Sequence, residues 1–173
     1  MQKIVAAAVL AALFLAGCSG AKGGDADPAE IFAAIKDHVR ADLEAAGYSD
    51  EDFQLQELPG YRIVNLQGAD FEQLPPGIRP DDFREGYMLE ADMMLNADRI
   101  ILFQAEKGKA GAIQDALELY QAAQLQMWEQ YMADQAEKVR NTIISARGDL
   151  VIYITYPDAD AIVDIFAKHA GRR

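Results

Sequence analysis

The sequence has few of the residues on which metal and disulfide chemistry depend. Only one of its 173 residues is cysteine and two are histidine, so neither an internal disulfide nor a thiolate zinc site is expected. His38 and His169 have no second ligand at metal-binding spacing, and we expect both to be surface residues without a metal. No Gly-x-Ser-x-Gly elbow, phosphate-binding glycine loop or dinucleotide fingerprint occurs. The sequence therefore predicts neither an enzyme nor a cofactor.

Basic residues are also scarce, with 16 Lys and Arg against 28 Asp and Glu and a net charge of −12. Proteins that bind duplex nucleic acid neutralise its phosphates with clustered Lys and Arg, so no nucleic-acid partner is expected. The excess of acid lies in residues 25–98, which carry a net −13, whereas residues 99–173 carry −1. This distribution favours a solvated acidic face, and docking to a basic partner is the alternative.

Long apolar runs are absent except at the N-terminus. Lys3 precedes an apolar run from Ile4 to Leu15, which is too short to span a bilayer, since a spanning helix needs about 20 apolar residues. The run ends in Leu-Ala-Gly-Cys18, which resembles the lipobox of bacterial lipoproteins, where a signal peptidase cuts before a diacylglyceryl cysteine.

We therefore expect residues 1–17 to be a lipoprotein signal peptide and Cys18 to be lipidated, and we expect residues 18–27 to form a flexible tether. The protein would lie on the extracytoplasmic face of the cell membrane, held by the lipid on Cys18. The alternatives are an ordinary secretory signal with an incidental cysteine, and a buried apolar helix.

Residues 28–169 have the pattern of one folded domain, because the chain is 51% hydrophobic, which is too apolar for disorder. Asp27 and Pro28 are typical of an N-cap and a first helical turn, and Gly47 is typical of a helix end. Helices are expected over residues 28–46, 110–140 and after Asp158, with short helical turns at 49–52, 68–74 and 81–86. Strands are expected over residues 61–66, 87–95, 99–105, 141–146 and 150–156.

This order of elements predicts an α+β fold. We expect a small, mainly antiparallel sheet of about four strands, with a long helix and two shorter helices packed on one face. The short Gly-containing connection between residues 146 and 150 favours a hairpin of the last two strands.

Several segments occur in a characteristic order, namely Met94 to Ile100, Gln126 to Tyr131, Gly148 to Ile152, and Pro157 to Phe166. On these segments the chain, from about Pro28 to Lys168, resembles the DUF4358 family of small bacterial lipoproteins of unknown function. The resemblance implies an extracytoplasmic, membrane-anchored domain and no known reaction. The chain differs from the family at Ala133, where family members often have proline, and in its longer segment 47–80.

Trp128 and Tyr131 are the candidate residues for contact with a ligand or partner. They lie with Tyr120 and Met127 on one stripe of the helix expected over residues 110–140. Such a stripe is typical of core packing, and a groove for a sugar or a peptide is the alternative.

The leading hypothesis is a non-catalytic, lipid-anchored domain that binds an unknown envelope protein or small ligand. A solute-capturing accessory lipoprotein of a transporter is the second hypothesis, and a deep pocket with convergent polar groups would favour it. An exposed apolar patch would instead favour a protein partner. A cell-wall-modifying enzyme is the third, and it would need a buried carboxylate pair in a cleft.

Overall fold

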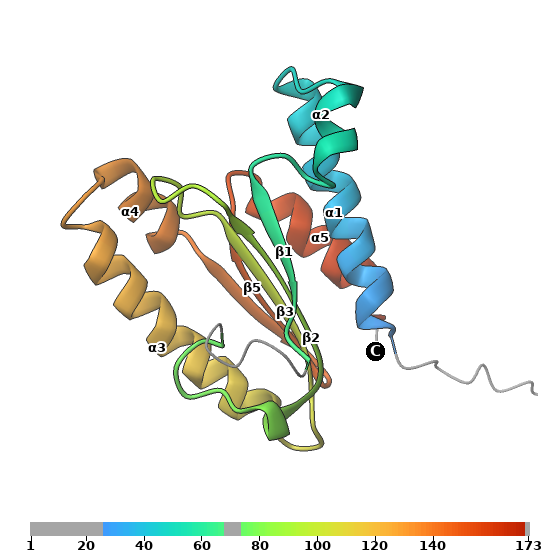
Figure 1. The fold of residues 1–173 in the computed structure, drawn as a ribbon. Coiled ribbons are helices and arrows are strands. Elements are labelled where there is room, and N and C mark those ends of the chain that lie inside the picture. The colour runs from blue at the N-terminus through green and yellow to red at the C-terminus, as the bar shows by residue number, and fades with distance from the viewer. Residues whose placement is uncertain (1–25, 68–73, 172–173) are drawn as a thin grey trace, which may run out of the picture.

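A five-stranded antiparallel sheet forms the centre of the computed structural model, which describes residues 26–67 and 74–171 (Figure 1). The strand order is β1-β2-β3-β5-β4, and each neighbouring pair is antiparallel. This confirms the predicted α+β class, and all five candidate strand segments join the sheet, for which about four strands were expected. The strands are β1 (Tyr61–Asn65), β2 (Phe83–Ala91), β3 (Arg99–Ala105), β4 (Ile143–Arg147) and β5 (Leu150–Thr155).

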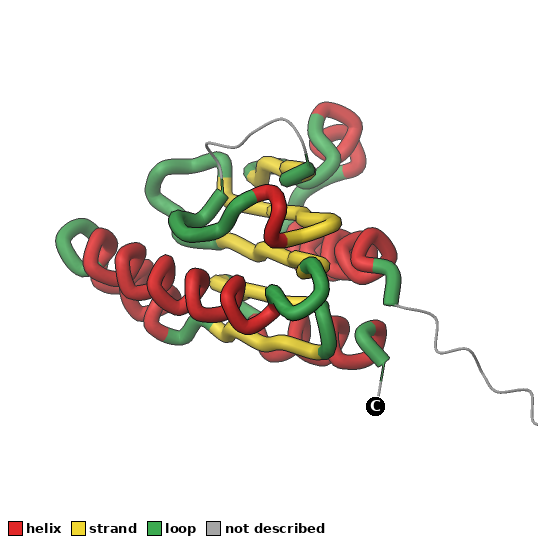
Figure 2. Tube along the Cα trace, turned by 90° about the horizontal axis from the view of Figure 1, so that it is seen from below, coloured by secondary structure: helices red, strands yellow, loops and turns green. Residues whose placement is uncertain are grey.

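Helices cover both faces of this sheet, as Figure 2 shows, and the expectation that they pack on one face is wrong. The central strand β3 is buried from Ile100 to Ala105, and every residue of β5 is buried. Leu102 packs in the core cluster beneath one helical layer, whereas its neighbour Ile101 packs in the cluster beneath the other. Strands that are apolar at every position, without alternation, have two buried faces.

Helices α1 (Pro28–Ala45) and α5 (Ala159–His169) form one layer. The Asp27 carboxylate accepts a hydrogen bond from the Ala29 backbone N–H at 2.9 Å, which confirms the predicted N-cap of α1. Asp158 caps α5 in the same way through the N–H of Ala161, at 3.3 Å. Their apolar stripes share one core cluster with the sheet, and its helical members include Ile31, Phe32, Ile35, Val39, Ile162 and Phe166.

The second layer consists of α3 (Ala110–Trp128) and α4 (Ala133–Arg140), which replace the single long helix predicted over residues 110–140. The chain turns at residues 129–132, where the carbonyl of Trp128 accepts hydrogen bonds from the N–H groups of Tyr131 and Met132. Trp128 and Val139 consequently lie in one apolar cluster. In a straight helix these two residues would be about 16 Å apart along the axis, so burial of Trp128 against α4 requires the turn.

Strand β2 begins earlier than predicted. A 3-10 turn, η2 (Pro80–Asp82), leads directly into the strand, which therefore includes Gly86 and ends at Ala91. A Cβ atom at Gly86 would meet side-chain atoms of Leu66, Phe83 and Phe103 at 3.1 Å, so glycine permits close packing here. Because the strand ends at Ala91, residues 92–98 form the loop between β2 and β3 instead of continuing the strand to residue 95.

Of the remaining predictions, some are confirmed by the structure and others concern residues that the structure does not describe. The short helix α2 (Asp50–Leu55) has Ser49 as its N-cap residue, and a Gly148 turn joins β4 to β5 as a hairpin. The predicted turn at 68–74 falls almost entirely on residues 68–73, outside the described residues, and so does the signal peptide with Cys18. No helix in residues 26–67 or 74–171 is long and apolar enough to cross a membrane.

Candidate functional site

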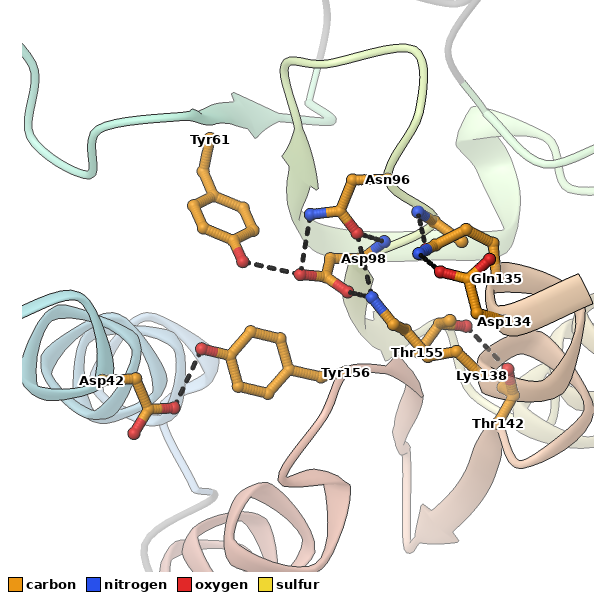
Figure 3. A network of polar contacts seen from close by, with 11 residues as sticks. Asp42, Tyr61, Asn96, Asp98, Asp134, Gln135, Lys138, Thr142, Thr155 and Tyr156 are labelled. Atoms are coloured by element: carbon orange, nitrogen blue, oxygen red, sulfur yellow. Dashed lines mark hydrogen bonds and ion pairs between the residues drawn. The ribbon is translucent and has the colours of Figure 1, made fainter. Parts of the chain in front are cut away.

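Polar side chains from both helical layers converge at the end of the sheet where β1 begins and β5 ends (Figure 3). Asp98 lies at the centre of this network and is only 4% exposed. Its carboxylate accepts hydrogen bonds from the hydroxyl of Tyr61 at 2.7 Å, the amide of Asn96 at 3.0 Å and the ammonium of Lys138 at 2.5 Å. A buried carboxylate is tolerated when donors of this kind compensate its lost hydration.

Two tyrosines extend the network to the layer of α1 and α5. The hydroxyl of Tyr156 donates to Asp42 on α1 at 2.9 Å. Burial, followed by the hydrogen bond to Asp98, raises the pKa of Tyr61 well above its usual range. Burial and the bond to Asp42 raise the pKa of Tyr156 in the same direction. Both phenols therefore remain protonated donors that join elements far apart in the sequence.

The two histidines differ in their surroundings. His169 is exposed, as expected, but the expectation of a surface position is wrong for His38. The His38 side chain is 22% exposed, and its Nε2 atom lies 3.6 Å from Asp42 and 3.9 Å from Asp158. His38 is half-buried because α1 packs against the start of α5.

Helix α4 holds the loop 92–98 against the protein. The side-chain carbonyl of Gln135 accepts a hydrogen bond from the Ala97 backbone N–H at 2.9 Å. Lys138 donates to Asn96 at 3.0 Å as well as to Asp98, and Ala97 packs on the cluster that contains Trp128. Four contacts from one short helix thus fix the position of a loop that has no strand or helix of its own.

The fixed loop places apolar side chains beside the turn between α3 and α4. Met94 and Leu95 line a hollow of about 370 Å³ together with Met127, Trp128 and Tyr131. Met94 is 93% exposed and Tyr131 is 75% exposed, whereas Trp128 is 8% exposed. We call these five residues the corner patch. Large apolar side chains that are exposed together, unlike single exposed ones, indicate an interaction surface.

The structure brings the two predicted site residues together but gives them different environments. Trp128 is a core residue at the base of the hollow, as helical spacing favours, and Tyr131 is exposed beside it. The sequence reasoning missed Met94 and Leu95, because residues 87–95 read as a strand. Asn96 was the sequence signal for a turn at this position. Its side-chain oxygen accepts a hydrogen bond from the Asp98 N–H at 3.1 Å, which forms a turn typical of asparagine.

A polar cavity of about 510 Å³ lies between α4 and the turn from β5 to α5. Its charged lining consists of Asp134, Glu137, Lys138, Asp158 and Asp160. Among the residues that the structure describes, no group of three or more His, Cys, Asp or Glu side chains is arranged to hold a metal ion. The cavity is therefore an acidic depression beside the network, suited to polar or cationic solutes.

Three carboxylates are buried in the described part of the chain, and each has a basic partner. Asp82 lies 3.1 Å from the Lys109 ammonium, and Asp98 lies 2.5 Å from that of Lys138. Glu90 lies 2.5 Å from Arg99 and also pairs with Arg62. Compensated carboxylates of this kind differ from the acid and base couple in a cleft that a glycosidase-type enzyme needs.

The comparisons with known proteins identify a family for the part of the chain that contains this site. Residues 76–156 match the family model described as a domain of unknown function, DUF4358. The resemblance expected from the sequence is confirmed over this segment, which contains the corner patch, α4 and most of the polar network. Neither the curated proteins nor the solved structures gave a match.

Proposed function

Taking as the premise that residues 76–156 form a DUF4358 domain, we propose that this protein is a lipid-anchored lipoprotein of the bacterial envelope that binds another envelope protein. Cys18 carries the lipid, and the corner patch is the binding surface. The single observation that supports partner binding is the group of exposed apolar side chains around Trp128.

The position of the corner patch favours a protein over the bilayer as its occupant. The chain enters the described part at Ala26, beside the start of α1, whereas the end of α3 and helix α4 lie on the far side of the sheet from it (Figure 1). Helix α1 has 18 residues and is about 27 Å long. In the proposed arrangement the lipid anchor joins the domain at the start of α1, which is remote from the turn between α3 and α4 that carries the patch. The net −13 of residues 25–98 opposes adsorption to anionic lipid as well.

The charges beside the corner patch define the chemistry of the partner. Asp92 precedes the apolar loop residues and Asp134 follows Tyr131 in the sequence, and both are exposed, whereas Glu129 is paired with Arg140 at 2.9 Å. The expected partner is a segment with apolar side chains flanked by Lys or Arg. Methionines at 94 and 127 suit this role, because their unbranched side chains adapt to different apolar surfaces.

The size of the patch predicts a transient complex. Full burial of one large apolar side chain contributes about 1.5–3 kcal/mol, and three such side chains contribute roughly 5–9 kcal/mol. Association itself costs an estimated 4–15 kcal/mol, so these contacts alone give weak binding. A weak complex dissociates while an extract is washed. The partner is therefore best captured by crosslinking inside cells.

Photo-crosslinking in living cells tests this proposal. A photoreactive phenylalanine analogue replaces Tyr131 in the full chain, and a matched variant carries it at Leu119 on the outer face of α3. The two positions are 75% and 73% exposed, so they differ in location and hardly in access to solvent. We expect an adduct from position 131 only, with the crosslinked peptide of the partner apolar and flanked by basic residues.

Other adducts would contradict the proposal. Crosslinking of position 131 to lipid, to a second copy of this chain or to an acidic peptide would each overturn it, as would equal labelling from position 119. A Met94→Glu variant places a carboxylate on the patch without changing a buried residue. We expect this variant to lose the adduct while its unfolding midpoint stays within about 0.5 kcal/mol of the parent chain.

The lipid anchor has its own test. Cells that express the full chain are fed an alkyne fatty acid, and the protein is assayed for label and for sedimentation with membranes. We expect the parent chain to take up label and Cys18→Ala to take up none, because the thiol is the acylated group. A Ser19→Ala variant is the control and is expected to behave like the parent. Label on Cys18→Ala would refute lipidation at this residue.

The alternative function is solute capture for a transporter, and the acidic cavity of about 510 Å³ between α4 and α5 is the observation that favours it. A solute held there would contact Asp134 and Asp160 and would be polyhydroxylic or cationic. A thermal shift of the full chain with such solutes, abolished in Asp160→Asn, would favour this function over partner binding.

A further inference from the structure

A separate cavity of about 340 Å³ lies on the α3 face of the sheet. Two arginines from neighbouring regions of the sheet line it, Arg62 on β1 and Arg99 on β3, and Glu90 of β2 lies between them. The remaining lining is apolar or aromatic and consists of Leu74, Pro75, Pro76, Met88 and Tyr120. None of these residues belongs to the corner patch.

Glu90 holds both guanidinium groups at the cavity. Its side chain is 6% exposed, and its two carboxylate oxygens accept one hydrogen bond from Arg62 and one, at 2.5 Å, from Arg99. Each guanidinium carries five N–H donors, so most donors of both arginines are not used by Glu90. Within the described residues, the buried Nε of Arg99 donates to no acceptor.

The charge of this group is unusual for the chain. Two guanidinium groups and one carboxylate leave a local charge of about +1, although the whole sequence carries −12. The single charge of Arg99 is enough to neutralise the buried Glu90 carboxylate. Arg62, the other partner of Glu90, is 50% exposed. The second arginine is thus surplus to the neutralisation of Glu90 and is available for an anion from solution.

The walls of the cavity define the body of the ligand. The guanidinium of Arg99 lies 5.6 Å from the centre of the Tyr120 ring, within the range of a cation–π contact. Pro75, Pro76 and Met88 offer flat or adaptable apolar surfaces around it. A planar carboxylate matches the fork of N–H donors on arginine, and a flat ring attached to it would pack on these walls.

We propose that this cavity binds a carboxylate carried on a flat, apolar ring. Arg62 and Arg99 donate to the carboxylate, Glu90 fixes both guanidinium groups, and Tyr120 with the two prolines contacts the ring. This site is independent of the corner patch and of the lipid anchor, so its test does not depend on the proposed function.

Titration calorimetry of the full chain in non-ionic detergent tests the site, with benzoate as the probe. Benzamide is the uncharged control of the same shape, and acetate is the carboxylate without a ring. We expect benzoate to bind, and acetate and benzamide to bind at least about tenfold more weakly. Arg62→Gln is expected to weaken benzoate binding about tenfold, because it removes a charged hydrogen-bond donor at an exposed position.

Two further variants separate a ligand site from a structural ion-pair cluster. Arg147→Gln is the control, since Arg147 is an exposed arginine at the end of β4 and does not line the cavity. It is expected to bind benzoate like the parent. Glu90→Gln keeps a side-chain oxygen that accepts hydrogen bonds from the guanidinium groups but removes the negative charge that opposes an incoming carboxylate, and we expect about tenfold tighter binding of benzoate.

Four results would overturn the proposal. They are no benzoate binding at millimolar concentration, equal binding of acetate or benzamide, unchanged binding in Arg62→Gln, and unchanged or weaker binding in a folded Glu90→Gln chain. Circular dichroism of each variant shows whether it is folded. If Glu90→Gln does not fold, the comparison of Arg62→Gln with Arg147→Gln decides the proposal on its own.

Discussion

Asp82, the last residue of η2 before β2, is a buried carboxylate whose charged form is favoured. It accepts a hydrogen bond from the backbone N–H of Arg79 at 2.9 Å, and its other oxygen lies 3.1 Å from the Lys109 ammonium. These contacts, the backbone bond first, hold the pKa of Asp82 below its ordinary value. A carboxylate with a lowered pKa stabilises the fold above its unfolded pKa of about 3.9, and this contribution is lost as the pH falls through the folded pKa.

Asp82→Asn is therefore expected to be less stable than the parent chain by about 1–3 kcal/mol at pH 7, since hydrogen bonds to a charged group are lost. The difference should shrink as the pH falls below about 4. Urea unfolding at several pH values measures it. Asp81→Asn, an exposed neighbour in η2, is the control, and a pH-independent difference for Asp82→Asn would contradict the argument.

Lys138 and Arg140, both in the last turn of α4, give a second prediction at this scale. Lys138 neutralises Asp98, which is 4% exposed, whereas Arg140 pairs with Glu129, and both of those side chains are about half exposed. Replacing one partner of a buried ion pair lowers the free energy of unfolding by about 3–5 kcal/mol, whereas an exposed pair contributes about 0–1 kcal/mol. Lys138→Met should lower the free energy of unfolding by about 3 kcal/mol, and Arg140→Met by less than about 1 kcal/mol. Equal losses would show that Asp98 does not depend on Lys138.

The elements themselves were predictable where local chemistry decides them. Asp27 with Pro28, and Asp158, mark helix starts in the sequence and also in the structure. The Gly148 turn is equally local, because it needs a positive φ, here 65°. Element bounds failed where tertiary contacts decide them. The break between α3 and α4 depends on burial of Trp128 against Val139, and periodicity along one segment cannot show that contact.

A local signal for the break was nevertheless present in the resemblance. The resemblance implies proline in family members where Ala133 stands, and Ala133 is the first residue of α4. Proline is favoured at this position, since its missing N–H has no partner in the first turn. The placement of helices on both faces was also readable, because β3 and β5 are apolar at successive positions. For Met94 and Leu95 the sequence offered only the turn signal of Asn96, and their exposure depends on where β2 ends.

The loop 92–98 and helix α4 act as a unit, and Gln135 tests this. Gln135→Ala removes the acceptor for the Ala97 N–H while leaving Lys138 and Asp98 intact. We expect faster hydrogen exchange of the Ala97 amide and a weaker adduct from position 131, with little change in global stability. Gln114→Ala, a partly exposed glutamine of α3 that bonds to Glu118, is the control. Unchanged exchange at Ala97 would mean that other contacts hold the loop.

At the scale of the whole molecule, the segment that matches the family is not the whole folding unit. Residues 76–156 supply strands β2 to β5 and the helices of one layer, but α1 and α5 lie outside this segment. Without those two helices, one face of the sheet would expose buried residues, including Leu89, Ile100, Leu102, Ile152 and Ile154. Each fully buried aliphatic side chain contributes about 1.5–3 kcal/mol, so the cover is essential.

Truncation tests this view. A chain that ends at Pro157 lacks α5 and is expected to aggregate or to remain unfolded, whereas a chain that ends at Ala170 should unfold like the parent. Circular dichroism and sedimentation of both chains provide the measurement. A soluble, cooperatively unfolding chain without α5 would show that α1 alone covers this face of the sheet.

The two ends of the described chain leave the molecule side by side, since Ala26 and Ala170 both pack against the cluster beneath α1 and α5 (Figure 1). The linear order of the chain is therefore not dictated by its three-dimensional arrangement. A short linker from 171 to 26 would close the polypeptide into a ring, and new ends could be cut within the loop 92–98. Such a permuted protein keeps every helix and strand and gives up the corner patch, which would separate what the chain needs to fold from what it needs to recognise a partner.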